Sequence, residues 1–240
     1  MVERLRLANP GQEIEETEYM PHGTRLSHGV HCMEHLLQKL PQPHSVRVLE
    51  VGPFNGTPYF MLAAIAHLAK RNPELRCAAI GPQRPSQEGL VETLGSVPFI
   101  SGELAGFDHH AKKRKYDRAA QQVLATLDGP PDIIYADHVF ECSRGYEDTI
   151  PLGPWTIFEK CAEILNTGGF IVVDNAMGHV SQVSFPHAPQ AKRMHLTYRY
   201  SYDKKPEEKY VPAIFVFQKK EVELPEDEHL RIMQIMNQGF

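Results

Sequence analysis

The feature that most constrains this 240-residue chain is the stretch from residue 46 to residue 66, which reads VRVLEVGPFNGTPYFMLAAIA. A short apolar run carries Glu50 near its end, passes through a turn with Gly52 and Gly56, and leads into a second apolar run. This order predicts a β-strand, a glycine turn and an α-helix. A nucleotide-like ligand can approach the backbone at such a turn, so the stretch indicates a cofactor-binding α/β enzyme.

Apolar runs alternate with helical segments along the middle of the chain, which is the pattern of a parallel sheet covered on both faces. The expected strands are 46–51, 76–80, 98–100, 132–136 and 170–173. The expected helices between them are 58–70, 86–94, 111–127 and 155–165.

The last part of the chain has a different pattern. Apolar and polar side chains alternate over residues 194–202 (MHLTYRYSY). A polar loop is expected at 203–208 and a second strand at 211–218. This predicts an antiparallel hairpin appended to the parallel strands. The predicted fold class is therefore α/β and Rossmann-like, with a seven-stranded, mostly parallel sheet and a C-terminal antiparallel hairpin.

An amphipathic helix is predicted before the first strand. Between residues 27 and 40, apolar side chains recur at steps of three and four, and Pro41 and Pro43 end the pattern. We expect one domain over residues 1–240, with an N-terminal arm and helix (1–45), a Rossmann-like core (46–220) and an acidic C-terminal tail (221–240).

Composition narrows the partners and the compartment. A net charge of −5 and a pI near 6.2 argue against a broad electrostatic surface for nucleic acid. The four cysteines include no CxxC pair, the first residues have no apolar signal core, and no apolar run reaches the roughly 20 residues that cross a bilayer. We expect a soluble, cytoplasmic protein with a small-molecule substrate and no membrane partner; arm exchange within a homodimer is compatible with the pattern.

The dinucleotide fingerprint G-x-G-x-x-G is absent, because Phe54 and Thr57 stand where its second and third glycines would be. What remains is E-x-G-x-x-x-G, from Glu50 to Gly56. With five parallel strands followed by an antiparallel pair, it resembles the class I S-adenosylmethionine-dependent methyltransferases. Within them it is most similar to small O-methyltransferases of the catechol and caffeoyl-coenzyme A type, over residues 26–219.

Two further matches carry the resemblance. The fourth expected strand runs into Asp137, and the family's fourth strand also ends in an acidic residue. The fifth follows the pair Gly168-Gly169 and ends in Asp174-Asn175, as it does in the family. The resemblance implies a class I methyltransferase fold and the methylation of a small-molecule hydroxyl.

The resemblance also implies a cofactor site. Gly52 and Gly56 would let the backbone approach S-adenosylmethionine, and Glu50 would orient its amino group. The residues expected around the cofactor are Glu50, Gly52, Pro53, Phe54, Asn55, Gly56, Gln83 and Asp137. The alternative is that the glycines only shape a tight turn.

A divalent cation, Mg²⁺ or another, is the second implied group. Asp137, Asp174 and Asn175 resemble its oxygen ligands in the catechol-type enzymes, and such oxygens suit a hard ion. Asp137 and His138 are the expected catalytic residues, with His138 as general base if no metal is bound. The alternatives are that the aspartates cap loops and that His138 has no role.

The second strand departs from the family. Class I methyltransferases usually end it with an acidic residue that binds both ribose hydroxyls, whereas this chain continues from Ala79 through Gly81 and Pro82 to Gln83. A glutamine offers no charged, bidentate contact. A catalytically inactive domain that binds proteins through its arm and tail is therefore the alternative function, and nicotinamide chemistry is disfavoured by the missing fingerprint.

Three other groups have competing interpretations. His28, His31 and His35 with Cys32 could bind zinc, but they have no companion pair and more simply line an entrance or face solvent. The basic run 112–115 is expected on an exposed helix face, with a phosphate-bearing substrate or RNA as the alternative. The tyrosines at 198, 200 and 202 have the spacing of one sheet face and are expected in the core or at a subunit contact.

Overall fold

The computed structural model describes twelve segments of the chain. They are residues 32–33, 35–40, 45–51, 74–81, 97–102, 104, 107–108, 113–114, 116–137, 154–174, 191–201 and 213–228. The expected helices at 58–70 and 86–94 lie outside these segments. Within them, no helix is both long enough and apolar enough to cross a membrane.

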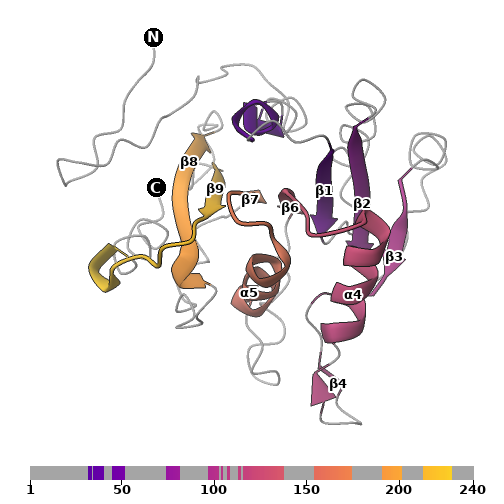
Figure 1. The fold of residues 1–240 in the computed structure, drawn as a ribbon. Helices are drawn as coiled ribbons and strands as arrows, with labels where there is room; N and C mark the ends of the chain where they lie inside the picture. The colour runs from indigo at the N-terminus through magenta and orange to yellow at the C-terminus, as the bar shows by residue number, and fades with distance from the viewer. Residues whose placement is uncertain are drawn as a thin grey trace, which may run out of the picture.

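A seven-stranded sheet forms the centre of the molecule (Figure 1). Its strands are β1 (Val46–Val51), β2 (Leu75–Gly81), β3 (Phe99–Ser101), β6 (Ile133–Asp137), β7 (Phe170–Asp174), β8 (Met194–Ser201) and β9 (Ala213–Lys219). The spatial order is β3-β2-β1-β6-β7-β9-β8, in which the first five strands are parallel and β9 pairs antiparallel with both β7 and β8. The predicted fold class is confirmed.

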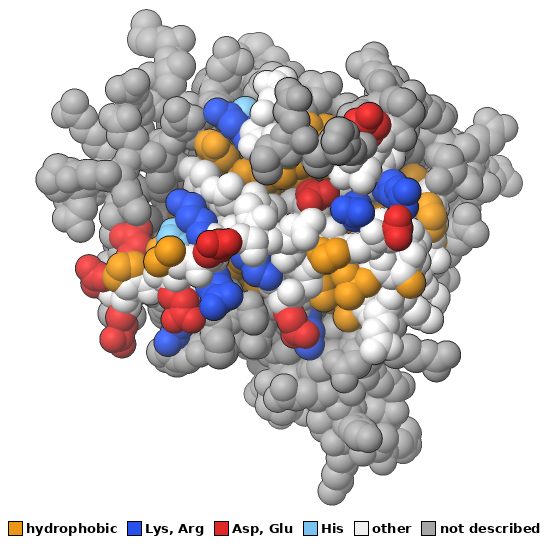
Figure 2. Space-filling view, in the orientation of Figure 1, with side chains coloured by type: hydrophobic (Ala, Val, Ile, Leu, Met, Phe, Trp, Pro, Cys, Tyr) orange, Lys and Arg blue, Asp and Glu red, His pale blue; other side chains and the backbone are white. Residues whose placement is uncertain are grey.

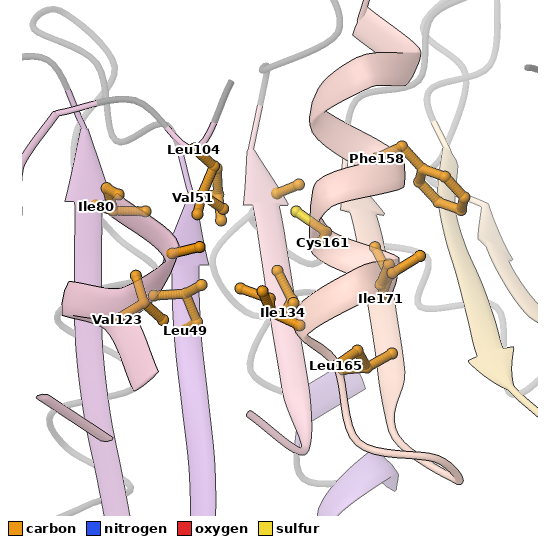
Figure 3. Packing of buried hydrophobic residues seen from close by; sticks show 14 of the residues in the cluster. Leu49, Val51, Ile80, Leu104, Val123, Ile134, Phe158, Cys161, Leu165 and Ile171 are labelled. Atoms are coloured by element: carbon orange, nitrogen blue, oxygen red, sulfur yellow. The ribbon is translucent and has the colours of Figure 1, made fainter. Parts of the chain in front are cut away.

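Among the described residues, two helices cover one face of this sheet. They are α4 (Tyr116–Leu127) and α5 (Pro154–Ile164). In α4 the buried side chains Ala119, Ala120, Val123 and Leu127 recur with helical spacing and form one apolar stripe. This stripe and its counterpart on α5 pack on alternate strand residues such as Leu49, Ile134 and Ile171, as Figure 3 shows.

The other face of the sheet packs against the helix that precedes β1. We call this segment, with helical residues 32–33 and 35–39, the arm helix. Its Cys32, Met33 and Leu36 are almost fully buried, and Leu40 follows them into the same apolar cluster. The strand residues of that cluster alternate with those beneath α4 and α5. The predicted amphipathic helix is therefore confirmed as a covering element over its described residues, while residues 27–31 and 34 lie outside the described segments.

A β-bulge in β8 changes the face of the sheet toward which its side chains point. Leu196 pairs with Phe217 and packs with the cluster beneath α5, whereas Tyr198 pairs with Val216 and joins the cluster beneath the arm helix. Thr197 is the extra residue between them, and its Oγ1 donates to the carbonyl of His195 at 3.0 Å. The regular alternation expected over 194–202 is therefore interrupted, because one added residue inverts the side-chain direction. Tyr198 belongs to the core, as predicted.

A polar network ties the strands together at their amino ends. The backbone N–H of Arg47 donates to Asp132 Oδ2 at 2.9 Å, and Asn166 Nδ2 donates to Asp132 Oδ1 at 2.7 Å. Arg47 Nε also donates to the carbonyl of Leu127, the last residue of α4, at 3.1 Å. Asp132 thus connects the start of β1 to the turn before β7, and Arg47 holds the end of α4.

One expected helix begins later than the sequence predicted. Residues 111–127 were expected to be helical, but β5 (Lys113–Arg114) pairs antiparallel with β4 (Phe107–Asp108), and α4 starts at Tyr116. An extended backbone at 113–114 cannot belong to a helix. Lys113 and Arg114 therefore do not lie on a helix face, and the prediction was wrong for these two residues; residues 112 and 115 lie outside the described segments. The pairing with residues 107–108 outweighs the helix propensity of lysine and arginine.

Candidate active site

The strand order places a switch point between β1 and β6. From β1 the chain moves outward through β2 to β3, and it returns to the other side of β1 to form β6 and then β7. In open parallel sheets, ligands bind outside the carboxyl ends of the strands at such a point. Glu50, Asp137 and Asp174 lie at or next to the carboxyl ends of β1, β6 and β7.

Glu50 is a buried carboxylate beside this switch point. It is only 1% exposed, and its Cα partners on the neighbouring strands are Ala79 and Tyr135. Burial, reinforced by the charge of Glu50, raises the pKa of the Cys77 thiol on β2 to about 12. Since a buried carboxylate is costly to desolvate, its place at a ligand-binding edge favours a binding role over a packing role.

Asp137 and Asp174 are brought together by the register of β6 and β7. They are Cα partners on adjacent parallel strands and are the last residue of each. Adjacent strands lie about 4.8 Å apart, so the two backbones are within the span of one small ligand or ion. By strand alternation, positions 137 and 174 follow Tyr135 and Val172, which belong to the arm-helix face as Glu50 does.

The remaining predicted site residues lie outside the described segments. They are Gly52, Pro53, Phe54, Asn55, Gly56, Gln83, His138 and Asn175. The strand before Gln83 is described, however, and β2 ends at Gly81, which pairs with Ser101. No acidic residue ends β2, so the departure noted in the sequence coincides with the strand end itself.

Sequence reasoning missed the surroundings of Glu50. Tyr135 is fully buried and is the direct register partner of Glu50. The negative charge of Glu50 also contributes to the raised pKa of Cys77. Counting back in steps of two from Asp137 and from Ala79 would have placed both residues on the face of Glu50. That alternation was the available signal.

The zinc alternative finds no support in the described segments. Cys32 is fully buried in the apolar cluster, and the ring of His35 contacts the ring of Tyr198 edge-on, with centroids 5.0 Å apart. Among the residues described, no three His, Cys, Asp or Glu side chains are grouped as metal ligands. His28 and His31 lie outside these segments.

Charged side chains of both signs are interspersed on the face shown in Figure 2. Around β8 and the segment after β9, exposed Lys192 and Lys220 alternate with exposed Glu221 and Glu223. The described part of this face therefore presents no continuous basic surface of the kind that binds a nucleic-acid backbone.

No family model and no curated protein matches this chain. Solved structures do match it. The CMeT domain of the citrinin polyketide synthase has a TM-score of 0.50 at 12% identity, covering 82% of this chain and 52% of that one. The fold is that of a Rossmann-like methyltransferase.

Two further solved structures match this chain with lower TM-scores. A candidate class I S-adenosylmethionine-dependent methyltransferase from Listeria monocytogenes matches with a TM-score of 0.47 at 13% identity, over 88% of this chain and 70% of that one. The MycE methyltransferase of the mycinamycin biosynthetic pathway, solved with Mg, SAH and mycinamycin VI, matches with a TM-score of 0.46 at 14% identity, over 82% of this chain and 51% of that one. This chain thus spans about half the length of two of the three proteins.

Proposed function

We propose that this protein is an S-adenosylmethionine-dependent methyltransferase that modifies a hydroxyl of a small molecule, assisted by a divalent cation. One observation carries the proposal. Glu50, Asp137 and Asp174 lie at the carboxyl end of three adjacent strands, beside the switch point of a methyltransferase fold. Each position belongs to the alternating set of one face of the sheet.

The residues at the end of β1 suit this cofactor. S-adenosylmethionine, when bound, supplies a methyl group on a positively charged sulfur. Glu50 would accept hydrogen bonds from the ligand's amino group, and the turn from Gly52 to Gly56 would let the backbone approach its methionine and ribose parts. Because Glu50 is buried, its carboxylate acts in a medium of low dielectric, where attraction to a cation is stronger than in water.

Asp137 and Asp174 suit a hard cation such as Mg²⁺. Paired carboxylates on adjacent strand ends, with the amide of Asn175 next in the chain, form the kind of oxygen donor set that such an ion prefers. The ion, when bound, lowers the pKa of a coordinated hydroxyl. The protein itself would hold the acceptor in place and exclude water, and in the absence of metal His138 would take the proton.

Two observations favour a second candidate function. β2 ends at Gly81 without an acidic residue, so the usual charged contact with the cofactor ribose is missing. The segment after β9 also exposes several acidic side chains, namely Glu221, Glu223, Glu226 and Asp227. A catalytically inactive methyltransferase-like domain that binds a partner protein through this tail is therefore the alternative.

Calorimetric titration of the purified protein with S-adenosylmethionine and with S-adenosylhomocysteine separates the two functions. Each ligand is titrated with and without Mg²⁺. We expect micromolar binding of both, because Glu50 and the glycine turn are retained. Failure to bind at millimolar ligand would refute the methyltransferase proposal and favour the inactive domain.

Substitution tests the metal separately. Asp174→Asn removes one carboxylate with little change in size, and we expect it to abolish Mg²⁺-dependent turnover while S-adenosylhomocysteine still binds. Glu221→Gln removes the same charge from an exposed position after β9 and is the matched control. Unchanged turnover in Asp174→Asn would exclude a ligand role for this residue.

A further inference from the structure

A single row of paired residues runs from Glu50 to Tyr198 across five strands. Glu50 pairs with Tyr135, Tyr135 with Val172, Val172 with Val216, and Val216 with Tyr198. Strands lie about 4.8 Å apart, so the ends of this row are about 19 Å apart. Tyr198 therefore cannot touch Glu50, and an influence on the site needs an element that spans the row.

The arm helix is that element. It packs on the cluster that contains Tyr135, Val172 and Val216, which is the middle of the row. Over residues 32–39 it is about 12 Å long, since a helix rises 1.5 Å per residue, and the cluster that it joins takes residues from all of β1, β6, β7, β9 and β8. On the same face, the next positions toward the carboxyl edge are Asp137 and Asp174.

The arm helix contacts β8 through an aromatic pair. The rings of His35 and Tyr198 meet edge to face, at a centroid distance of 5.0 Å and an interplanar angle of 67°. On its other side, Tyr198 lies 6.4 Å from the ring of Phe170 on β7. The bulge at Thr197 makes the contact available, because regular alternation after Leu196 would put Tyr198 on the face beneath α5.

We propose that His35 and Tyr198 are positioning residues for the cofactor site. Their contact fixes the arm helix against the carboxylate-bearing face, so that breaking it weakens cofactor binding without removing any group that touches the cofactor. The inference rests on the proposed methyltransferase function. An edge-to-face ring pair sets the size of the effect, which corresponds to a loss of affinity of about two- to tenfold.

The fold offers a matched control on the opposite face. Phe158 of α5 and Phe217 of β9 also meet edge to face, at 5.1 Å and 77°. Phe217 is fully buried and lies in the cluster beneath α4 and α5. Tyr198→Leu and Phe217→Leu therefore each remove one edge-to-face ring pair, and Tyr198→Leu also removes the tilted contact with Phe170. Only Tyr198→Leu loosens the arm helix, while Tyr198→Phe keeps the ring and loses only the hydroxyl.

Two measurements on the full-length variants test the proposal. The first is the dissociation constant for S-adenosylhomocysteine by calorimetry, and the second is amide hydrogen exchange over residues 35–39 by mass spectrometry. We expect Tyr198→Leu to raise both the dissociation constant and the exchange rate, with Phe217→Leu and Tyr198→Phe close to wild type in both. His35→Leu should reproduce Tyr198→Leu.

The proposal is overturned if Tyr198→Leu binds S-adenosylhomocysteine as tightly as wild type, or if Phe217→Leu weakens binding equally, since the effect would then be general destabilisation. A wild-type protein that does not bind S-adenosylhomocysteine would refute the proposed function and the effect on affinity together. The exchange data would in that case still decide whether the pair anchors the arm helix, because they need no ligand.

Discussion

Lys219 allows a direct test of how β9 is joined to the end of α5. This lysine of β9 is 8% exposed, and its Nζ donates to the carbonyls of Ala162 at 2.7 Å and Leu165 at 2.8 Å, with a weaker contact to that of Glu163 at 3.4 Å. These carbonyls belong to the C-terminal end of α5, where the helix has no backbone donors of its own to offer. Lys219→Met keeps the length of the side chain and removes the donor.

The expected cost follows from those contacts. A buried carbonyl left without a donor costs about 1–3 kcal/mol, so the two short hydrogen bonds set a loss of roughly 2–6 kcal/mol. Part of this is recovered, because the variant no longer has to desolvate an ammonium group. We therefore expect the free energy of unfolding to fall by about 2–4 kcal/mol, which in a chain of this size lowers the midpoint by roughly 4–16 °C.

Urea unfolding followed by circular dichroism measures the loss, with Lys220→Met at the next, exposed position as control. The pH dependence gives a second readout. Burial, together with nearby Arg193, lowers the pKa of Lys219 below 10.5. At pH values between the lowered pKa of Lys219 in the folded protein and the 10.5 of the unfolded chain, Lys219 binds more protons in the unfolded chain. Wild-type stability therefore rises with pH over that range, and this rise disappears in Lys219→Met. A variant within about 0.5 kcal/mol of Lys220→Met would refute the reasoning.

Three other predictions concern the core and its edges. In the Cys142→Ser variant, Ellman's reagent should leave the thiols of Cys32, Cys77 and Cys161 unmodified in the native state. Cys32 is fully buried, and burial raises the pKa of Cys77 and of Cys161 to about 12. Rapid reaction of any of the three thiols would contradict this prediction. Gly169→Ala should destabilise by about 1–3 kcal/mol in urea titrations, since its Cβ would lie 2.7 Å from the carbonyl of Asp132; a variant within about 0.5 kcal/mol of wild type would argue against the clash. Burial lowers the pKa of His195 below 6.5, so as the pH falls the unfolded chain binds a proton at this residue before the folded protein does, and stability decreases below pH 6.5. His195→Gln should show a smaller decrease in urea titrations at these pH values. An identical decrease would exclude His195 as the cause of the pH dependence.

Much of the sheet could be predicted from the sequence, because each strand carries its own apolar run. The expected bounds of β1 coincide with the observed ones, β6 begins and ends one residue later than expected, and β7 ends one residue later than expected. Glu50, Asp137 and Asp174 could be picked out for the same reason, since they follow or end those runs. Their grouping at one edge is then a consequence of parallel pairing.

What the sequence did not reveal depends on contacts between distant residues. The pairing of Lys113–Arg114 with Phe107–Asp108 replaces the first part of the expected helix, and nothing within residues 111–115 indicates it. The bulge at Thr197 is equally hidden, because it is defined by the partner strand β9. The role of Lys219 depends on α5, more than fifty residues away along the chain.

The hydrogen bonds around Asp132 lie at the amino edge of the sheet, opposite the candidate site at the carboxyl edge. Arg47, Asp132 and Asn166 join β1, β6 and the turn before β7 at the amino edge, whereas Glu50, Asp137 and Asp174 lie at the ends of the same strands on the carboxyl edge. Substitutions in the segments that follow β1, β6 and β7 leave these hydrogen bonds in place. The scaffold can therefore exchange its substrate-facing loops, by evolution or by grafting, while the amino edge preserves strand order.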